Sequence, residues 1–226
     1  MFTRYAIYHT PAPGTPLDSF GAHWLGWDSA QGAARPHPDM GGLDLAEVTA
    51  KPRKYGFHGT IKPPFHLAEG TTAQGLSDAV AAFCAGAAPV TLDGVELARL
   101  GRFLALVPDG DASALAGLAA RAVQELDPFR APASATELDK RRASRLSAAQ
   151  EAHLRRWGYP YVLDQFRFHM TLTGPLEDHK AAEVETALAD PLTALDLAPY
   201  HIDGLTLMGE DAAGKFHQIH RYGLTG

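Results

Sequence analysis

The chain has 226 residues, enough for one large domain or two closely packed lobes around a hydrophobic core. Hydrophobic residues make up 46% of the chain and charged residues 20%, which indicates a globular protein and argues against a disordered one. The formal net charge of −6 argues against a protein that coats long nucleic acids, because such proteins present a basic face. No extended nucleic-acid binding is therefore expected.

Cysteine content and hydropathy exclude further classes of protein. Cys84 is the only cysteine, which excludes an internal disulfide and argues against a cysteine-based zinc site. The apolar runs are too short to span a membrane, and the first residues lack the pattern of a signal peptide. The sequence therefore predicts a cytoplasmic protein without a membrane partner.

Strand and helix patterns alternate along the first half of the chain. Aromatic and β-branched residues favour strands, and apolar residues at helical spacing favour helices. The expected elements are a strand at 2–8, helices at 17–25 and 43–49, a motif strand at about 55–62, a helix at 72–87, strands at 90–97 and 103–107, and a helix at 112–126.

The second half begins with a basic linker at about 127–146. Ser147 and Gln150 have the spacing of a capping box, so a helix is expected from there through Trp157, ending at Gly158. The remaining elements expected are a second motif strand at about 164–173, a helix at 177–188, and a hairpin with strands at 202–208 and 216–222.

One nine-residue pattern occurs twice, as Phe-His-x-Thr-apolar-x-x-Pro-apolar. The two copies begin at Phe57 and Phe168, and their histidines are His58 and His169, one in each half of the chain. On a strand, residues i and i+2 project to the same face. His58 should therefore point the same way as Thr60, and His169 the same way as Thr171.

The pair of His-x-Thr motifs suits the opening of a phosphodiester. One neutral imidazole takes a proton from water while the other, as imidazolium, protonates the departing oxygen. Threonine hydroxyls hold the non-bridging oxygens, and the scheme requires no metal or cofactor. Alternatively, duplicated strands could place two histidines in a core for packing reasons alone. A metal hydrolase is a further alternative, but no His-x-His or His-x₃-His cluster supports it.

Each half contains a motif strand among further strands and helices, which predicts an α+β fold. We expect residues 1–226 to form a single bilobed domain with pseudo-twofold symmetry. Each lobe would contribute an antiparallel sheet with helices outside, and the two sheets would face a central cleft.

The paired motifs resemble the His-x-[Ser/Thr]-x signatures of the 2H phosphoesterase superfamily. Four blocks resemble one bacterial family in it that is associated with phosphonate metabolism: residues 4–8, 24–28, 54–60 and 167–171. The resemblance implies the bilobed fold of that superfamily and a cyclic phosphodiesterase. The implied substrate is a small phosphorylated ribose with a 1,2-cyclic phosphate. Alternatives are a 2′,3′-cyclic nucleotide or RNA-end phosphodiesterase, and a non-catalytic phosphoribosyl or nucleotide sensor.

Five further residues are candidates for binding the substrate. Lys62 lies two residues beyond Thr60, and Arg167 two residues before His169, so regular strands would turn both cations toward the phosphate. Arg141 and Arg142 belong to the basic linker, which is either a solvated connection or a flap over a second phosphate group. Tyr161 could stack on a sugar or base.

Overall fold

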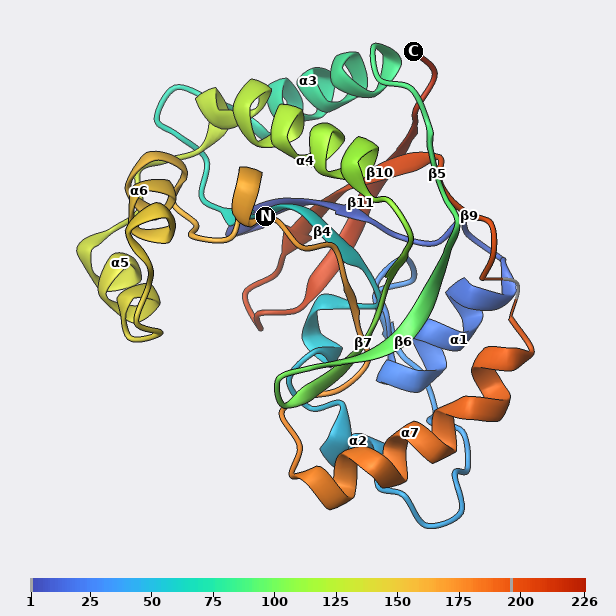
Figure 1. Ribbon diagram of the computed structural model, residues 1–226. Helices are drawn as coiled ribbons and strands as arrows, with labels where there is room; N and C mark the ends of the chain where they lie inside the picture. Colours follow the sequence, from blue (N-terminus) through green and yellow to red (C-terminus); the bar gives the residue numbers. More distant parts are fainter. Residues whose placement is uncertain (1, 196) are drawn as a thin grey trace.

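A computed structural model describes residues 2–195 and 197–226 (Figure 1). Its centre is a seven-stranded antiparallel sheet in the order β11-β10-β1-β4-β8-β7-β6. The strands of this sheet are β1 (Arg4–His9), β4 (Gly59–Phe65), β6 (Gly94–Leu100), β7 (Phe103–Asp109), β8 (Met170–Thr171), β10 (Gly204–Glu210) and β11 (Phe216–Gly223). Two small sheets pair β2 (Trp27–Asp28) with β3 (Ala33–Ala34), and β5 (Val90–Leu92) with β9 (Tyr200–Ile202).

Helices cover both ends of the sheet. They are α1 (Pro16–Leu25), α2 (Leu45–Val48), α3 (Ala73–Ala85), α4 (Ser113–Glu125), α5 (Ala135–Arg142), α6 (Ala148–Trp157) and α7 (Asp178–Thr193), with short 3₁₀ turns at Arg53–Tyr55, Asp127–Phe129 and Leu163–Gln165. In Figure 1, α3 and α4 lie together at one end, and α1, α2 and α7 gather at the other. The α5–α6 pair stands to one side. In the described part of the chain, no helix is both long and apolar enough to cross a bilayer.

The predicted α+β class with antiparallel strands is confirmed. The sequence predicted two sheets, and they correspond to two parts of this one sheet. One part has four strands (β11-β10-β1-β4) and the other has three (β8-β7-β6). They are not separate, because the two motif strands pair with each other. That junction has a single residue pair, Gly59 with Met170. The two parts of the sheet therefore meet at the motifs.

Both motif histidines lie immediately before their strands. The 3₁₀ turn at Arg53–Tyr55 and Gly56, which has a φ of 73°, precede His58. The predicted strand at 164–173 is wrong in extent, because β8 has only two residues and a 3₁₀ turn occupies Leu163–Gln165. The predicted capping box of Ser147 and Gln150 is confirmed, as is the helix end at Gly158.

A glycine makes room for each motif phenylalanine. A Cβ atom added to Gly21 would lie 2.4 Å from the ring of Phe57, and one added to Gly59 would lie 2.2 Å from the ring of Phe168. Such distances are far below van der Waals contact, so neither glycine tolerates a side chain without movement of the ring. Phe168 can thus lie across β4 only because residue 59 has no side chain.

We predict that Gly59→Ala lowers the free energy of unfolding by about 1–3 kcal/mol, the usual range for overpacking a core. Gly117→Ala is the control, because Gly117 lies exposed in α4 with nothing within 4 Å of an added Cβ. That change should be neutral or stabilise the helix by up to about 1 kcal/mol. Urea unfolding measures both, and equal stability of the two variants would contradict the packing described for Phe168.

Candidate active site

The pairing of β4 with β8 brings the four motif side chains onto one face of the sheet. Gly59 is opposite Met170 in this antiparallel pair. The residues next to them therefore also face each other, His58 opposite Thr171 and Thr60 opposite His169. Burial alternates accordingly: these four residues are half-buried, whereas Gly59 and Met170 between them are buried. Each histidine therefore faces the threonine of the other motif. The two histidines lie on a diagonal of the pairing, at a typical separation of roughly 7–8 Å.

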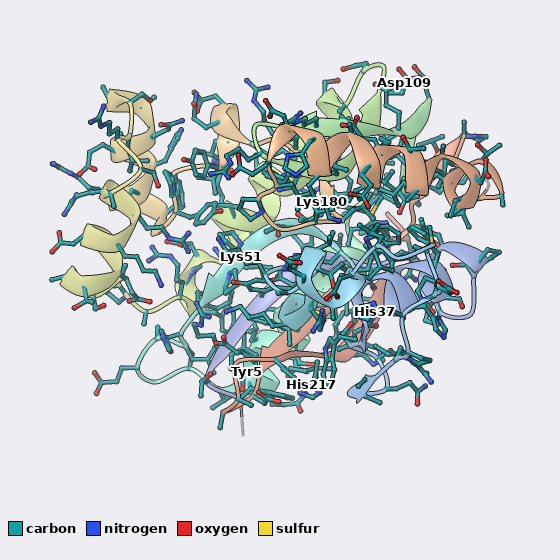
Figure 2. All side chains as sticks on the ribbon, turned by 90° about the horizontal axis from the view of Figure 1, so that it is seen from below. Tyr5, His37, Lys51, Asp109, Lys180 and His217 are labelled. Atoms are coloured by element: carbon teal, nitrogen blue, oxygen red, sulfur yellow. The ribbon has the colours of Figure 1, made fainter. Side chains whose placement is uncertain are left out.

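Cavities open on both sides of this group. His58 and Thr171 line one of about 790 Å³, and Thr60 and His169 line another of about 400 Å³. The four side chains thus line cavities and do not lie wholly within the packed core. Lys51, labelled in Figure 2, also lines the larger cavity.

Both imidazoles are held by the same backbone contact. Nδ1 of His58 lies 2.9 Å from the carbonyl oxygen of Gly56, and Nδ1 of His169 lies 2.8 Å from that of Arg167. A carbonyl oxygen only accepts, so Nδ1 carries the proton and donates it in both rings. The neutral tautomer thus leaves Nε2 as the basic nitrogen. In His58, Nε2 lies 3.1 Å from Oγ1 of Thr60, which donates to it.

Aromatic side chains surround His58. Tyr8 stacks on its ring at a centroid distance of 3.7 Å and an angle of 18°, and Tyr55 lies at 6.1 Å. Burial is the main cause that lowers the pKa of His58, the Gly56 carbonyl opposes this shift, and the nearby His169 adds to it, with a net value of about 4. His58 is therefore neutral at pH 7 and suited to accept a proton.

Lys62 does not face the phosphate site, and this prediction is wrong. The register between β1 and β4 shifts by one residue: Tyr8 pairs with Thr60, but Ile7 pairs with Lys62. This bulge reverses the alternation, so Lys62 points to the opposite side of the sheet from Thr60. Its side chain is buried, and Nζ donates to the carbonyl oxygen of Val123 at 2.9 Å.

Arg142 is also placed away from the cavities, contrary to the prediction. It pairs with Asp139 and with Glu151 of α6, the latter at 2.9 Å from Nη2 to Oε1. These two ion pairs hold the guanidinium group of Arg142 against Asp139 and α6, whereas its neighbour Arg141 forms neither pair. Arg141 does line a cavity, and its Cζ lies 4.6 Å from the ring centroid of Tyr159.

Arg167 and Tyr161 both line the cavity of Thr60 and His169. The regular strand expected to align Arg167 with His169 is absent, because β8 begins only at Met170. Arg167 contributes through its backbone as well, since its carbonyl oxygen holds His169. Tyr161 is 42% exposed, and its ring meets that of Tyr159 edge-on. Both residues remain candidates for contact with a ligand.

Sequence reasoning missed several residues that line the cavity of His58, among them Lys51, Lys54, Tyr55 and Lys140. It also assigned no role to Tyr8, which stacks on His58. Lys54 and Tyr8 lie in blocks that carry the family resemblance, which was the available signal. Lys140 offered none beyond the basic character of its segment.

Residues 60–217 match a protein family described as "Protein of unknown function (DUF1045)". The chain belongs to this family. Two curated relatives bear the name "Ribose 1,5-bisphosphate phosphokinase PhnN". The one from Janthinobacterium sp. (strain Marseille) is 40% identical over 220 residues, which cover 94% of this chain and 48% of the relative. The one from Laribacter hongkongensis (strain HLHK9) is 34% identical over 226 residues, which cover 96% and 51%.

The chain thus spans about half the length of the curated relatives it matches. The resemblance to a known bacterial family, predicted from the sequence blocks, is confirmed by these matches. Similar solved structures include a phosphoesterase (16% identity, TM-score 0.44, all of both chains covered) and E. coli LigT complexed with 3′-AMP (14% identity, TM-score 0.47, all of both chains covered). At such low identities and TM-scores, these structures do not indicate the chemistry of the site, which we therefore infer from the residues of this chain.

The stretch from Gly209 to Lys215 has the spacing G-x-x-x-x-G-K of a phosphate-binding P-loop, but not its context. A P-loop continues with Ser or Thr and opens a helix after a strand. Here Phe216 follows, and the stretch is the turn of the β10–β11 hairpin. Nζ of Lys215 lies 4.1 Å from the ring centroid of Trp27. Residues 209–215 therefore do not form a P-loop that would account for the kinase name of the relatives.

We predict that His58 titrates near pH 4 in NMR spectra of the histidine ring protons. The pKa of the folded state lies below the ordinary value of 6.5, so the unfolded chain takes up this proton first as the pH falls. Stability should accordingly decrease from about pH 6.5 toward pH 4 and should not depend on this group at higher pH.

Buried His9 also has a pKa lowered to about 4, so two such signals are expected in the wild type. His58→Ala should remove one of them and leave the other. A His58 signal with its midpoint near 6.5 would contradict the desolvation of this ring.

Proposed function

We propose that this chain opens a cyclic phosphodiester by general acid–base catalysis between His58 and His169. The observation that carries the proposal is the matched geometry of the two imidazoles. Each ring donates Nδ1–H to the carbonyl oxygen two residues earlier, and the paired strands turn both rings to one accessible face. Two pre-oriented Nε2 atoms on a diagonal suit an in-line displacement, in which the entering and leaving oxygens lie on opposite sides of phosphorus.

In the proposed reaction, Nε2 of His58 removes a proton from water, and the water oxygen forms a bond to phosphorus. The bond from phosphorus to one ring oxygen breaks, and protonated Nε2 of His169 donates its proton to that oxygen. The products are a phosphate monoester and a free hydroxyl group. The lowered pKa of His58 supports its assignment as the base, because the ring is neutral at pH 7. Thr171 would donate a hydrogen bond to a non-bridging oxygen, and Thr60 would do so after its hydroxyl turns from Nε2 of His58 to the bound phosphate.

The name of the relatives supports a particular substrate. They are called ribose 1,5-bisphosphate phosphokinases, and this chain corresponds to about half of each. Opening a 5-phosphoribosyl 1,2-cyclic phosphate with O2 as the leaving oxygen leaves the phosphate on O1, and the product is ribose 1,5-bisphosphate. We therefore propose this cyclic phosphate as the substrate and O2 as the oxygen that His169 protonates.

We expect His58→Ala and His169→Ala each to lower kcat by about 10²–10⁴-fold, the range for loss of a general acid or base. His179→Ala is the matched control, because His179 is exposed on α7 and outside both cavities. The measurement is steady-state hydrolysis of the cyclic phosphate. Near-wild-type turnover by either motif variant would exclude this mechanism.

Phosphorus NMR in the presence of EDTA tests the substrate and the independence from metal. The proposal predicts conversion of 5-phosphoribosyl 1,2-cyclic phosphate to ribose 1,5-bisphosphate, with a lower rate on 2′,3′-cyclic nucleotides. A higher rate on the nucleotides would favour the RNA-end phosphodiesterase instead. Binding without turnover would favour a sensor, and activity lost with EDTA and restored by zinc or manganese would favour a metal hydrolase.

A further inference from the structure

A third cavity, of about 360 Å³, lies beside the α5–α6 pair and is strongly basic. Five of its lining residues are cations, and one is a carboxylate, Glu137. The cations are Arg4, Lys54, Arg130, Lys140 and Arg141. In a chain with a net charge of −6, so many cations around one small cavity need a physical explanation.

Two of the five cations already have an ion-pair partner. Nη2 of Arg4 lies 2.6 Å from Oε1 of Glu210, and Nε of Arg130 lies 2.8 Å from Oδ1 of Asp127. The carboxylate of Glu137 is engaged as well, because one of its oxygens accepts from the backbone N–H and the hydroxyl of Ser134. These hydrogen bonds lower the pKa of Glu137, so it stays ionised, and one carboxylate lines the cavity with the three remaining cations.

Lys54, Lys140 and Arg141 have no ion-pair partner within the ranges that the structure describes. Lys54 and Arg141 lie against aromatic rings instead: Nζ of Lys54 is 4.8 Å from the centroid of Tyr55, and Cζ of Arg141 is 4.6 Å from that of Tyr159. An aromatic face holds a cation in place but uses none of its N–H donors. Three cations with unused donors thus converge on one cavity.

The basic cavity adjoins the histidine site. Lys54, Tyr55 and Lys140 line both this cavity and the one that contains His58 and Thr171. Tyr161 lines both this cavity and the one that contains Thr60 and His169. A small ligand with a phosphate between the histidines can therefore extend a second group toward the three cations.

We propose that Lys54, Lys140 and Arg141 form a subsite for a phosphate monoester carried by the same ligand. A dianionic phosphate matches three unpaired cations, and its oxygens accept from the lysine ammonium groups and from the fork of the guanidinium. The subsite rests on the proposed function in one respect, because the substrate proposed there is a cyclic phosphate that also carries a phosphate monoester. Binding of the monoester itself requires no chemistry at the histidines.

Calorimetric binding of ribose 5-phosphate tests the subsite, because this compound carries the monoester but no cyclic phosphate. We expect the double variant Lys140→Gln/Arg141→Gln, and separately Lys54→Gln, to weaken binding by about tenfold or more, as for loss of hydrogen bonds to a charged group. Arg155→Gln is the control, since Arg155 is an exposed cation of α6 that pairs with Glu151 outside the cavity. His58→Ala should leave the binding of ribose 5-phosphate unchanged.

Comparing two substrates then separates the subsite from the catalytic proposal. Arg141→Gln should lower kcat/KM for 5-phosphoribosyl 1,2-cyclic phosphate by about tenfold and lower that for ribose 1,2-cyclic phosphate much less, because Arg141 lines the basic cavity but not that of His58. Equal binding of ribose 5-phosphate to the wild type and to both sets of variants would overturn the subsite. Cation-dependent binding without turnover of either cyclic phosphate would instead overturn the catalysis and leave the subsite standing. Lys54 lies in the 3₁₀ turn at Arg53–Tyr55, whereas Lys140 and Arg141 lie on α5. If one of the two sets of variants fails to fold, the other set still tests the subsite.

Discussion

The antiparallel contact between Gly59 and Met170 is the constraint on which the site depends. It is the one residue pair that joins the two parts of the sheet, and it sets which side chains face each other across the junction. Because Gly59 has no side chain, the ring of Phe168 can lie across it and bring the second motif close. A shift of one residue in this register would turn a histidine of one motif to the other face of the sheet.

Around this junction, the protein gives the two sides of the site different electrostatic environments. Tyr8 and Tyr55 surround His58, and the resulting loss of water favours its neutral form. Lys54 and Lys140, in contrast, line the same cavity as cations that pair with no carboxylate of the described residues. The combination suits a reaction in which a neutral base works next to an anionic ligand. A net negative charge on the whole chain is compatible with this arrangement, because the cations act at short range within one cavity.

Two of the predicted binding residues show where reasoning from periodicity fails. Lys62 follows Thr60 at the correct spacing, but a bulge between β1 and β4 adds one residue and turns the lysine into the core. Arg141 and Arg142 are adjacent in a basic run, yet only Arg141 lines a cavity, because ion pairs with Asp139 and Glu151 hold Arg142 elsewhere. Lys140 and Lys54 line a cavity together with Arg141, although these two lysines are 86 positions apart in the sequence.

The sequence by itself determined the local structure and the identity of the motif residues. The α+β class, the capping box at Ser147 and the i, i+2 relation of each histidine to its threonine all depend on neighbours in the chain. Only the tertiary structure decided that His58 faces Thr171, that Tyr8 desolvates His58, and that Lys54 shares a cavity with Lys140. Strand register, burial and the convergence of charges depend on contacts between distant segments, and side-chain periodicity carries no information about those contacts.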